Sequence, residues 1–322
     1  MMNWETLLEQ MRTGSVSALS RLITLVADRA AGWQEAMKDL YPDLRYAPAI
    51  GITGYPGSGK SSLTGQLARE LAGREKRVGV ISIDPSSHRS GGAFLGDRIR
   101  MNPNLPGLEG VYIRSMASRG AIGGIHPAVR DVIKILDVFG KDYILVETVG
   151  VGQEEIDITL ATQLVLLVCA PGQGDAIQYL KAGLMEMVDI YVANKVDLPE
   201  AEAMLHNLNG ILMQEESKSD CGHAPIIKTN ALQGEGIAEL AGTIEKKAGA
   251  NHSREIWKRR IAIQDVVSLV RERLEAEIGP SQWVKETEGE SALNAILTGR
   301  SDPYLVADEM MAKVLEKLIK KY

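Results

Sequence analysis

A glycine-rich loop is the part of this sequence whose residue types and spacing indicate chemistry most directly. Residues 54–61 read Gly-Tyr-Pro-Gly-Ser-Gly-Lys-Ser and match the pattern G-x-x-x-x-G-K-[ST]. They follow an apolar run at 50–53 and precede an amphipathic stretch, the strand, loop and helix order that the pattern requires. In such a loop the backbone N–H groups point at phosphates, and the helix N-terminus adds partial positive charge. We therefore expect Lys60 to reach the β- and γ-phosphates of a nucleotide and the Ser61 hydroxyl to bind Mg²⁺. The predicted phosphate-binding residues are Gly54, Tyr55, Pro56, Gly57, Ser58, Gly59, Lys60, Ser61 and Ser62.

Two later loops carry polar residues suited to recognising a base. One reads Asn-Lys-Val-Asp at 194–197 and the other Asn-Ala-Leu at 230–232, and each follows a predicted strand. Ligands bind at the carboxyl ends of the strands in an open α/β sheet. The Asp197 carboxylate can accept hydrogen bonds from the N1–H and the exocyclic amine of guanine, whereas adenine presents an acceptor at N1. A plain turn is the alternative for such a short string, but its position after the phosphate loop favours a guanine site. The predicted base-binding residues are Asn194, Lys195, Asp197, Asn230, Ala231 and Leu232.

A parallel sheet is the element pattern that would bring these loops together. Short apolar runs alternate with amphipathic stretches between about residues 49 and 250, which is typical of repeated βαβ units. Runs such as Tyr143–Val146 favour strands that are buried on both faces. The predicted fold class is therefore α/β, a doubly wound, mostly parallel sheet forming a P-loop G domain with N- and C-terminal helical extensions. The predicted strands are Ile50–Thr53, Val78–Ile83, Val111–Arg114, Tyr143–Glu147, Leu164–Cys169, Ile190–Asn194 and Pro225–Thr229.

Helical segments flank the predicted G domain on both sides. In the prefix, Leu19, Leu22, Ile23 and Val26 form one stripe, and Gly14 followed by Ser15 or Ser17 indicates a break and an N-cap. The predicted division is a helical arm at 1–46, a GTPase domain at 47–250 and a helical region at 251–322 that serves packing or oligomerisation. The helices expected in the last region are Ser253–Ile278, Glu288–Thr298 and Asp302–Lys321.

Composition indicates which kinds of partner the protein binds and in which cellular compartment it is expected. The chain has 322 residues, with 36 Lys and Arg against 42 Asp and Glu, a net charge of −6. Such a mildly acidic chain lacks the basic field that non-specific nucleic-acid binding depends on. Cys169 and Cys221 are too few for a disulfide framework or a zinc finger. No apolar run reaches the length of a membrane span, and the N-terminus lacks the basic residues of a signal peptide. We expect a cytoplasmic protein with neither a nucleic-acid nor a membrane partner.

Longer strings make the chain resemble the GTPases associated with methylmalonyl-CoA mutase, the MeaB/ArgK-type members of the SIMIBI class of P-loop proteins. The resemblance runs from the helical prefix to Asp-Pro-Tyr at 302–304. Strings of this length are more discriminating than the phosphate loop, which occurs in many families. They are Asp-Pro-Ser-Ser at 84–87, Leu-Gly-Asp-Arg-Ile-Arg-Met at 95–101, Arg-Ser-Met-Ala-Ser-Arg-Gly at 114–120, Glu-Thr-Val-Gly-Val-Gly-Gln at 147–153 and Pro-Gly-Gln-Gly-Asp at 171–175.

The resemblance implies roles for five further residues. Asp84 orients or activates the attacking water, and Asp97 is the switch I acid that contacts Mg²⁺. Glu147 takes the place of the Walker B acid and contacts Mg²⁺ through water, while Gly150 offers its N–H to the γ-phosphate. Lys181 lies in a third switch loop and is expected to contribute to catalysis. Simpler roles stay open: a turn cap at Asp84, and solvated side chains at Asp97 and Lys181.

The resemblance also implies a function. It implies a Mg²⁺-dependent GTPase that converts GTP and water into GDP and phosphate and acts as a chaperone for an adenosylcobalamin-dependent acyl-CoA mutase such as methylmalonyl-CoA mutase. The chaperone would gate cofactor loading and protect or reactivate the enzyme, and adenosylcobalamin would enter only through that partner. A homodimer is implied, with the C-terminal helices as the interface. Two alternatives are a kinase acting on a protein or small molecule, for which no second substrate motif is visible, and a nickel-insertion GTPase, which the lack of a Cys/His cluster disfavours.

Overall fold

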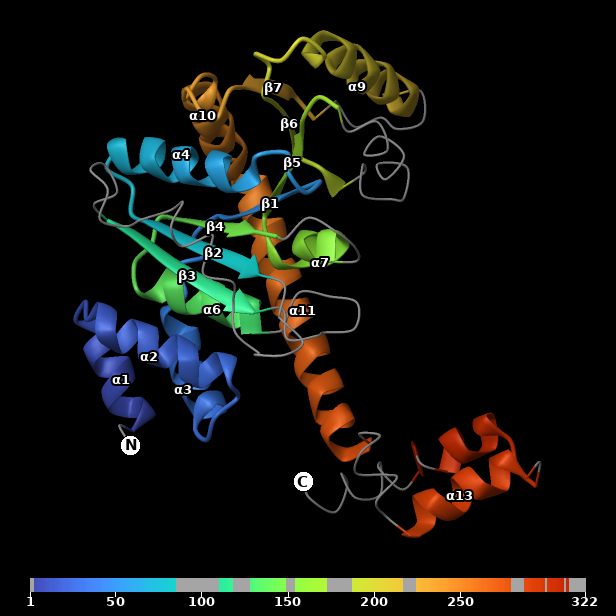
Figure 1. Ribbon diagram of the computed structural model, residues 1–322. Coiled ribbons are helices and arrows are strands. Elements are labelled where there is room, and N and C mark those ends of the chain that lie inside the picture. Colours follow the sequence, from blue (N-terminus) through green and yellow to red (C-terminus); the bar gives the residue numbers. More distant parts are fainter. Residues whose placement is uncertain are drawn as a thin grey trace. The chain divides into compact units, whose positions relative to one another are not determined.

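The computed structural model describes nine stretches of the chain. They are residues 3–84, 110–117, 128–148, 154–172, 187–216, 224–278, 287–298, 300–309 and 311–312. The chain forms two compact units, Met1–Lys258 and Arg259–Tyr322 (Figure 1). Three of the predicted site residues, Asp97, Gly150 and Lys181, lie outside the described residues.

A parallel sheet forms the centre of the first unit. Its seven strands, in the part of the chain that is described, lie in the order β3-β2-β4-β1-β5-β6-β7, and every neighbouring pair is parallel. The predicted fold class is confirmed, and each predicted strand is present. The strands are β1 (Ala49–Gly54), β2 (Val78–Asp84), β3 (Val111–Ala117), β4 (Tyr143–Glu147), β5 (Leu164–Cys169), β6 (Ile190–Asn194) and β7 (Ile226–Thr229).

Strand β3 is longer than the sequence predicts. Its expected end was Arg114, because the apolar run stops there, but the strand continues to Ala117. The extra residues stay paired with β2, where Ser82 lies opposite Ser115 and Asp84 opposite Ala117. Backbone hydrogen bonds to a long neighbouring strand therefore extend β3 beyond the residues whose side chains favour it.

Helices cover both faces of the sheet (Figure 1). Helices α4 (Lys60–Gly73) and α10 (Ile237–Ala248) lie on one face, and their apolar side chains form a buried cluster with alternate residues of the strands. Helices α6 (Ala128–Val138) and α7 (Glu154–Ala161) lie on the other face, and α9 (Ala201–Glu216) packs through Leu208 against Leu167 and Tyr191. Because both faces are buried, the central strands are continuously apolar, as the sequence indicated.

The N-terminal helices pack against the sheet domain. They are α1 (Trp4–Arg12), α2 (Val16–Ala27) and α3 (Trp33–Leu40), followed by a short 3₁₀ turn at Tyr41–Asp43. The predicted stripe of α2 is buried, and the side chain of Ser15 accepts a hydrogen bond from the Ala18 N–H as its N-cap. Arg29 pairs with Asp131 of α6 at 2.7 Å. The arm is thus part of the first compact unit, while the predicted boundary at residue 46 stays a prediction.

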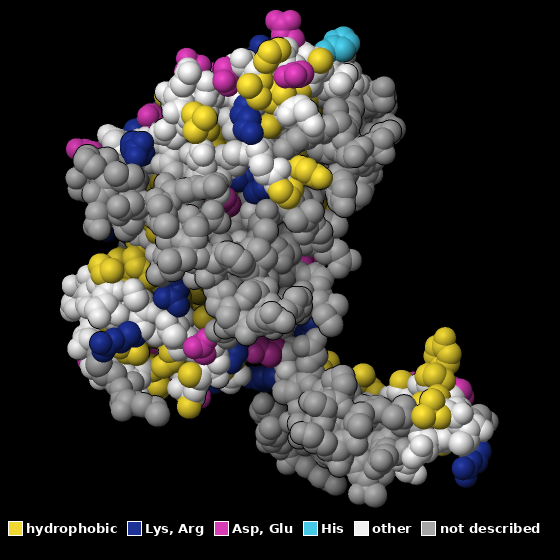
Figure 2. Space-filling view, in the orientation of Figure 1, with side chains coloured by type: hydrophobic (Ala, Val, Ile, Leu, Met, Phe, Trp, Pro, Cys, Tyr) yellow, Lys and Arg dark blue, Asp and Glu magenta, His cyan; other side chains and the backbone are white. Residues whose placement is uncertain are grey.

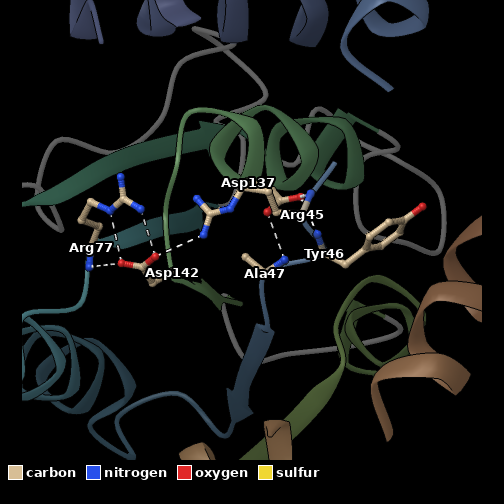
Figure 3. A network of polar contacts seen from close by, with 6 residues as sticks. All are labelled: Arg45, Tyr46, Ala47, Arg77, Asp137 and Asp142. Carbon is tan, nitrogen blue, oxygen red and sulfur yellow. Dashed lines mark hydrogen bonds and ion pairs between the residues drawn. The ribbon is translucent and has the colours of Figure 1, made fainter. Parts of the chain in front are cut away.

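Two aspartates hold the segment that joins this arm to β1 (Figure 3). Asp137 accepts hydrogen bonds from the backbone N–H groups of Arg45, Tyr46 and Ala47, at 2.8, 2.8 and 3.0 Å. Burial raises the pKa of the Asp137 carboxyl, and the three N–H donors counteract part of that rise. Asp142 accepts from the backbone and side chain of Arg77 and from Arg45. These contacts lie at the amino ends of β1, β2 and β4. The predicted phosphate and base loops lie at the opposite edge of the sheet, at the carboxyl ends of the strands.

The C-terminal region is helical in its described residues. Helix α11 (Asn251–Ile278) begins in the first unit, where Trp257 is buried, and continues into the second. Helix α13 (Thr287–Leu297) follows, and residues 303–309 and 311–312 are also helical. Within the described part of the chain, no helix combines the length and the apolar character needed to cross a membrane.

Candidate nucleotide-binding site

The phosphate loop lies between β1 and α4, and glycine is required at both of its ends. Gly54 has φ +142°, and a Cβ there would lie 2.3 Å from the backbone oxygen of Val168 in β5. Gly59 has φ +94°, and a Cβ there would lie 2.4 Å from Nδ2 of Asn194. Other residues rarely adopt a positive φ, and here they would also clash. The loop is consequently held close to the ends of β5 and β6.

Lys60 is the first residue of α4 and is 6% exposed. Its Nζ donates to the backbone oxygens of Gly54 at 2.7 Å and Tyr55 at 3.1 Å, so the ammonium group lies over the loop. A buried positive charge beside a cavity favours an anion next to it, because desolvation of the charge is then offset. The contact of Lys60 with the β- and γ-phosphates stays a prediction.

Ser61 and Glu147 meet at the carboxyl end of the sheet. Oγ of Ser61, in the first turn of α4, donates to Oε1 of Glu147 at the end of β4, with 2.5 Å between the two oxygens. Glu147 is almost fully buried and lines the same cavity as Ser61. Mg²⁺ takes oxygen ligands and retains several waters, so the hydroxyl oxygen of Ser61 and the carboxylate of Glu147 fit that ion. In the described residues, no group of three or more His, Cys, Asp or Glu side chains forms a further metal cluster.

Asn194 connects the phosphate loop to the second base loop. Its side chain is buried, with Nδ2 donating to the Ser58 oxygen at 2.8 Å. Its Oδ1 accepts from the Thr229 hydroxyl at 3.1 Å and from the Ala231 N–H at 3.0 Å. The residue was predicted as a base-binding side chain, and the structure adds that its amide holds two loops together. A buried amide that is bonded at both its nitrogen and its oxygen fixes the spacing between the phosphate loop and the loop at 230–232.

Lys195 and Asp197 belong to the first of the two predicted base-binding loops, at 194–197. Lys195 has φ +59°, and its Nζ donates to the Gly57 oxygen at 2.7 Å, so its stem spans from the base loop to the phosphate loop. Asp197 is exposed and lines the cavity. An exposed carboxylate at this position is free to accept the two donors on the Watson–Crick edge of guanine.

One cavity of about 530 Å³ joins these parts. Its size suits a small-molecule ligand. Most of the predicted phosphate- and base-binding residues line it, whereas Gly54, Tyr55 and Ser58 are not among its described lining residues. Its lining residues are Pro56, Gly57, Gly59, Lys60, Ser61, Ser62, Ser82, Ile83, Glu147, Thr148, Asn194, Lys195, Asp197, Leu198, Asn230, Ala231 and Leu232.

Four of these lining residues were not predicted from the sequence: Ser82, Ile83, Thr148 and Leu198. Ser82 and Ile83 come just before Asp84 in β2, and Ser82 lies opposite Glu147 in β4. Thr148 directly follows Glu147. Only their position could have indicated them, because residues next to a predicted site residue at a strand end lie at the same edge of the sheet. Asp84 ends β2 at that edge, as predicted.

Known proteins that are similar to this chain include GTPases and a fused mutase. A family model described as methylmalonyl Co-A mutase-associated GTPase MeaB matches residues 19–281. A putative GTPase of Pyrococcus horikoshii is 39% identical over 320 residues, covering 97% of this chain and 98% of the relative. A fused isobutyryl-CoA mutase of Geobacillus kaustophilus is 33% identical over 270 residues, covering 78% of this chain and 24% of that protein. The crystal structure of a LAO/AO transport system kinase shares the fold, with a TM-score of 0.67 and 20% identity over 98% of this chain and 99% of that chain.

Proposed function

The chain belongs to the MeaB family of methylmalonyl Co-A mutase-associated GTPases, and on that premise we propose that it is a Mg²⁺-dependent GTPase that acts as a chaperone of an adenosylcobalamin-dependent acyl-CoA mutase. GTP hydrolysis follows from membership of the family. The identity of the partner, the chaperone role, the metal and the homodimer are the proposal. In it, adenosylcobalamin belongs to the mutase, and this chain acts on its loading, protection or reactivation from the cytoplasm.

The fused relative is the observation that carries the mutase partner. In that protein, the region similar to this chain takes up 24% of a polypeptide named a fused isobutyryl-CoA mutase. A covalent link between two modules gives them an effective concentration in the millimolar range without any strong interface. A chain that lacks such a link needs a non-covalent surface for the same partner. We therefore infer that this chain binds an acyl-CoA mutase reversibly, under control of the bound nucleotide.

The hydrolytic step in this proposal is mainly positioning and electrostatic stabilisation. The loop backbone and Lys60 would hold the β- and γ-phosphates, and Ser61 and Glu147 would hold Mg²⁺, Glu147 through a water. When bound, Mg²⁺ neutralises charge that develops on the phosphate oxygens. Asp84 is the proposed residue that orients the attacking water. Asp97, Gly150 and Lys181 keep their predicted roles as proposals.

The proposed homodimer uses the C-terminal helices. In α11, Ile263, Val266, Val267 and Val270 recur at helical spacing, and all four are exposed, Val266 to 63%. Leu297 and Tyr304 are also exposed, and Figure 2 shows hydrophobic side chains gathered on the described part of this unit. Exposed apolar stripes of this kind are typical of helix surfaces that bind a partner. A second copy of the chain is the occupant that we propose.

The proposal is tested by complex formation with mutases. The full chain is mixed in turn with each adenosylcobalamin-dependent mutase of the source organism, in apo and cofactor-loaded form, with GDP or a non-hydrolysable GTP analogue. Size-exclusion chromatography is expected to show one complex whose stability differs between the two nucleotides. Absence of a complex with every mutase in both nucleotide states would overturn the chaperone assignment while leaving GTP hydrolysis intact.

A further inference from the structure

Two buried threonines join the ends of β1 and β4 beside the cavity. Thr53 is the last residue but one of β1, and Thr148 directly follows β4. The Thr148 hydroxyl donates to Oγ1 of Thr53 at 3.1 Å, and both residues are buried, with 2% and 0% exposed. The Thr148 N–H also donates to the Ile52 oxygen at 3.1 Å. The side-chain bond thus continues the pairing of the two strands one residue beyond Ile52 and Glu147.

Side-chain alternation places Thr148 and Glu147 on opposite faces of the sheet. Glu147 points to the face covered by α4, where Ser61 donates to it. The opposite face is the one that Gly51 and Thr53 share, and a Cβ on Gly51 would lie 2.7 Å from Ile158 of α7. The end of β4 is therefore bonded on both faces of the sheet. Ser61 bonds to Glu147 on the α4 face, and Thr53 bonds to Thr148 on the opposite face.

We propose that Thr148, through its hydroxyl bond to Thr53, is a positioning residue that sets the Glu147 carboxylate relative to the phosphate loop. Thr53 immediately precedes Gly54, the first residue of that loop, so the bond connects the strand that carries the loop to the strand that carries Glu147. This inference rests on the proposed role of Ser61 and Glu147 at Mg²⁺. It assigns the coupling between these two parts of the site to one pair of hydroxyl groups.

Removal of the hydroxyl should change the site more than the fold. Valine keeps the branched shape of threonine, so Thr148→Val removes one polar atom and leaves the Thr53 hydroxyl buried without it. Thr53→Val combined with Thr148→Val removes both groups, which relieves the cost of a buried unsatisfied hydroxyl. A displacement of a catalytic group by about 1 Å can cost on the order of 100-fold in rate. For a partial displacement of Glu147 we expect a loss of about tenfold.

The experiment measures four quantities for each variant. They are the Mg²⁺ concentration that half-maximally slows release of a fluorescent GDP analogue, kcat and KM for GTP, and the midpoint of thermal unfolding. We expect Thr148→Val and the double variant to need about tenfold more Mg²⁺ and to lose kcat, with KM for GTP changed less than about twofold. Thr148→Ser keeps the hydroxyl and is expected to restore the Mg²⁺ response.

The double variant separates positioning from packing. It is expected to unfold near the wild-type temperature and yet to keep the weakened Mg²⁺ response. Recovery of that response together with stability would overturn the inference, because the pair would then serve packing alone. Thr162→Val is the matched control, since Thr162 is also buried on this side of the molecule and its hydroxyl donates to the Ile158 oxygen at 2.7 Å. It is expected to lower stability without changing the Mg²⁺ response.

A further variant distinguishes failure of this inference from failure of the metal site. Ser61→Ala removes a proposed Mg²⁺ ligand directly. A raised Mg²⁺ requirement in Ser61→Ala with a normal one in Thr148→Val would overturn the positioning role alone. An unchanged requirement in Ser61→Ala would overturn the proposed metal site and the inference with it.

Discussion

At the scale of single residues, the candidate site contains groups that face the cavity and groups that hold the surrounding loops in place. Lys60 and Asp197 face the cavity, while the amide of Asn194 is bonded to protein groups at both of its ends. Substitutions at the two kinds of residue should therefore have different effects. Loss of a contacting group should weaken binding of a particular part of GTP, whereas loss of a holding group should also lower stability.

Lys60→Ala should greatly reduce nucleotide affinity. The substitution removes the ammonium group that lies over the phosphate loop, and charge-assisted hydrogen bonds to phosphate contribute about 1.5–3 kcal/mol each. We expect affinity for GTP to fall by on the order of 100-fold in a calorimetric titration. Lys246→Ala, in the last turn of α10, is the control, because that side chain is exposed and lies outside the cavity lining. Equal affinities in the two variants would contradict the assignment of the phosphate site.

Asp197→Asn should relax the choice of base. An amide presents one acceptor and one donor group where the carboxylate accepted two hydrogen bonds, so guanine loses at least one favourable contact. The preference for GTP over ATP is expected to fall by about tenfold or more, measured by competition against a fluorescent GDP analogue. An undiminished preference would show that another group selects the base.

At the scale of elements, strand ends and their register decide which residues form the site. The sequence predicted the phosphate loop, the base loops and all seven strands, because these features depend on local spacing and on continuous apolar runs such as Leu164–Val168. It did not indicate that Thr148 would bond to Thr53, or that Ser82 would lie opposite Glu147, because those contacts depend on the β1–β4 and β2–β4 registers. The hydrogen bond from Asn194 to Ser58 could not be predicted either, because it depends on how close β6 lies to the phosphate loop.

Contacts of Asp142 at the amino-terminal edge of the sheet predict how the stability of the protein depends on pH. Burial raises the pKa of the Asp142 carboxyl, but hydrogen bonds from Arg77 and Arg45 outweigh that effect and lower it to about 2. A lowered pKa in the folded state stabilises the protein above the unfolded value of about 4, and this contribution is lost as pH falls from about 4 to 2. Because the arginines are partly exposed, we expect only about 1 kcal/mol.

Asp142→Asn tests this contribution by urea unfolding at several pH values. At pH 7 the variant is expected to be less stable than the wild type by about 1 kcal/mol, and the difference should shrink as pH falls toward 2. A difference that stays constant over this range would show that the carboxylate charge is not its cause.

At the scale of the whole molecule, a GTPase unit is combined with a C-terminal unit that carries exposed apolar helix surface. All the described residues that line the cavity belong to the first unit. A separate role in assembly is therefore consistent with the proposed homodimer. The kinase alternative differs from the GTPase proposal because a kinase requires a second substrate that accepts the phosphoryl group.

Val266→Glu combined with Val270→Glu should dissociate the proposed homodimer. Both side chains are exposed in α11, so the substitutions should cost little in the monomer but place like charges in an interface between two copies. Sedimentation equilibrium is expected to show a dimer for the wild type and a monomer for the variant. Exposed Arg271→Glu is the control for added negative charge. A wild-type chain that is monomeric at micromolar concentration would contradict the proposal.

GTP turnover with and without the partner tests the central claim most directly. Phosphate release is measured in water with GTP, Mg²⁺ and the full chain, first alone and then with the adenosylcobalamin-dependent mutase that forms a complex with it. We expect GDP and phosphate in equal amounts without any acceptor, at a low rate that the mutase changes severalfold. Formation of GDP only when an acceptor is added, with the phosphoryl group on that acceptor and no free phosphate, would contradict the account, as would a rate that no mutase alters.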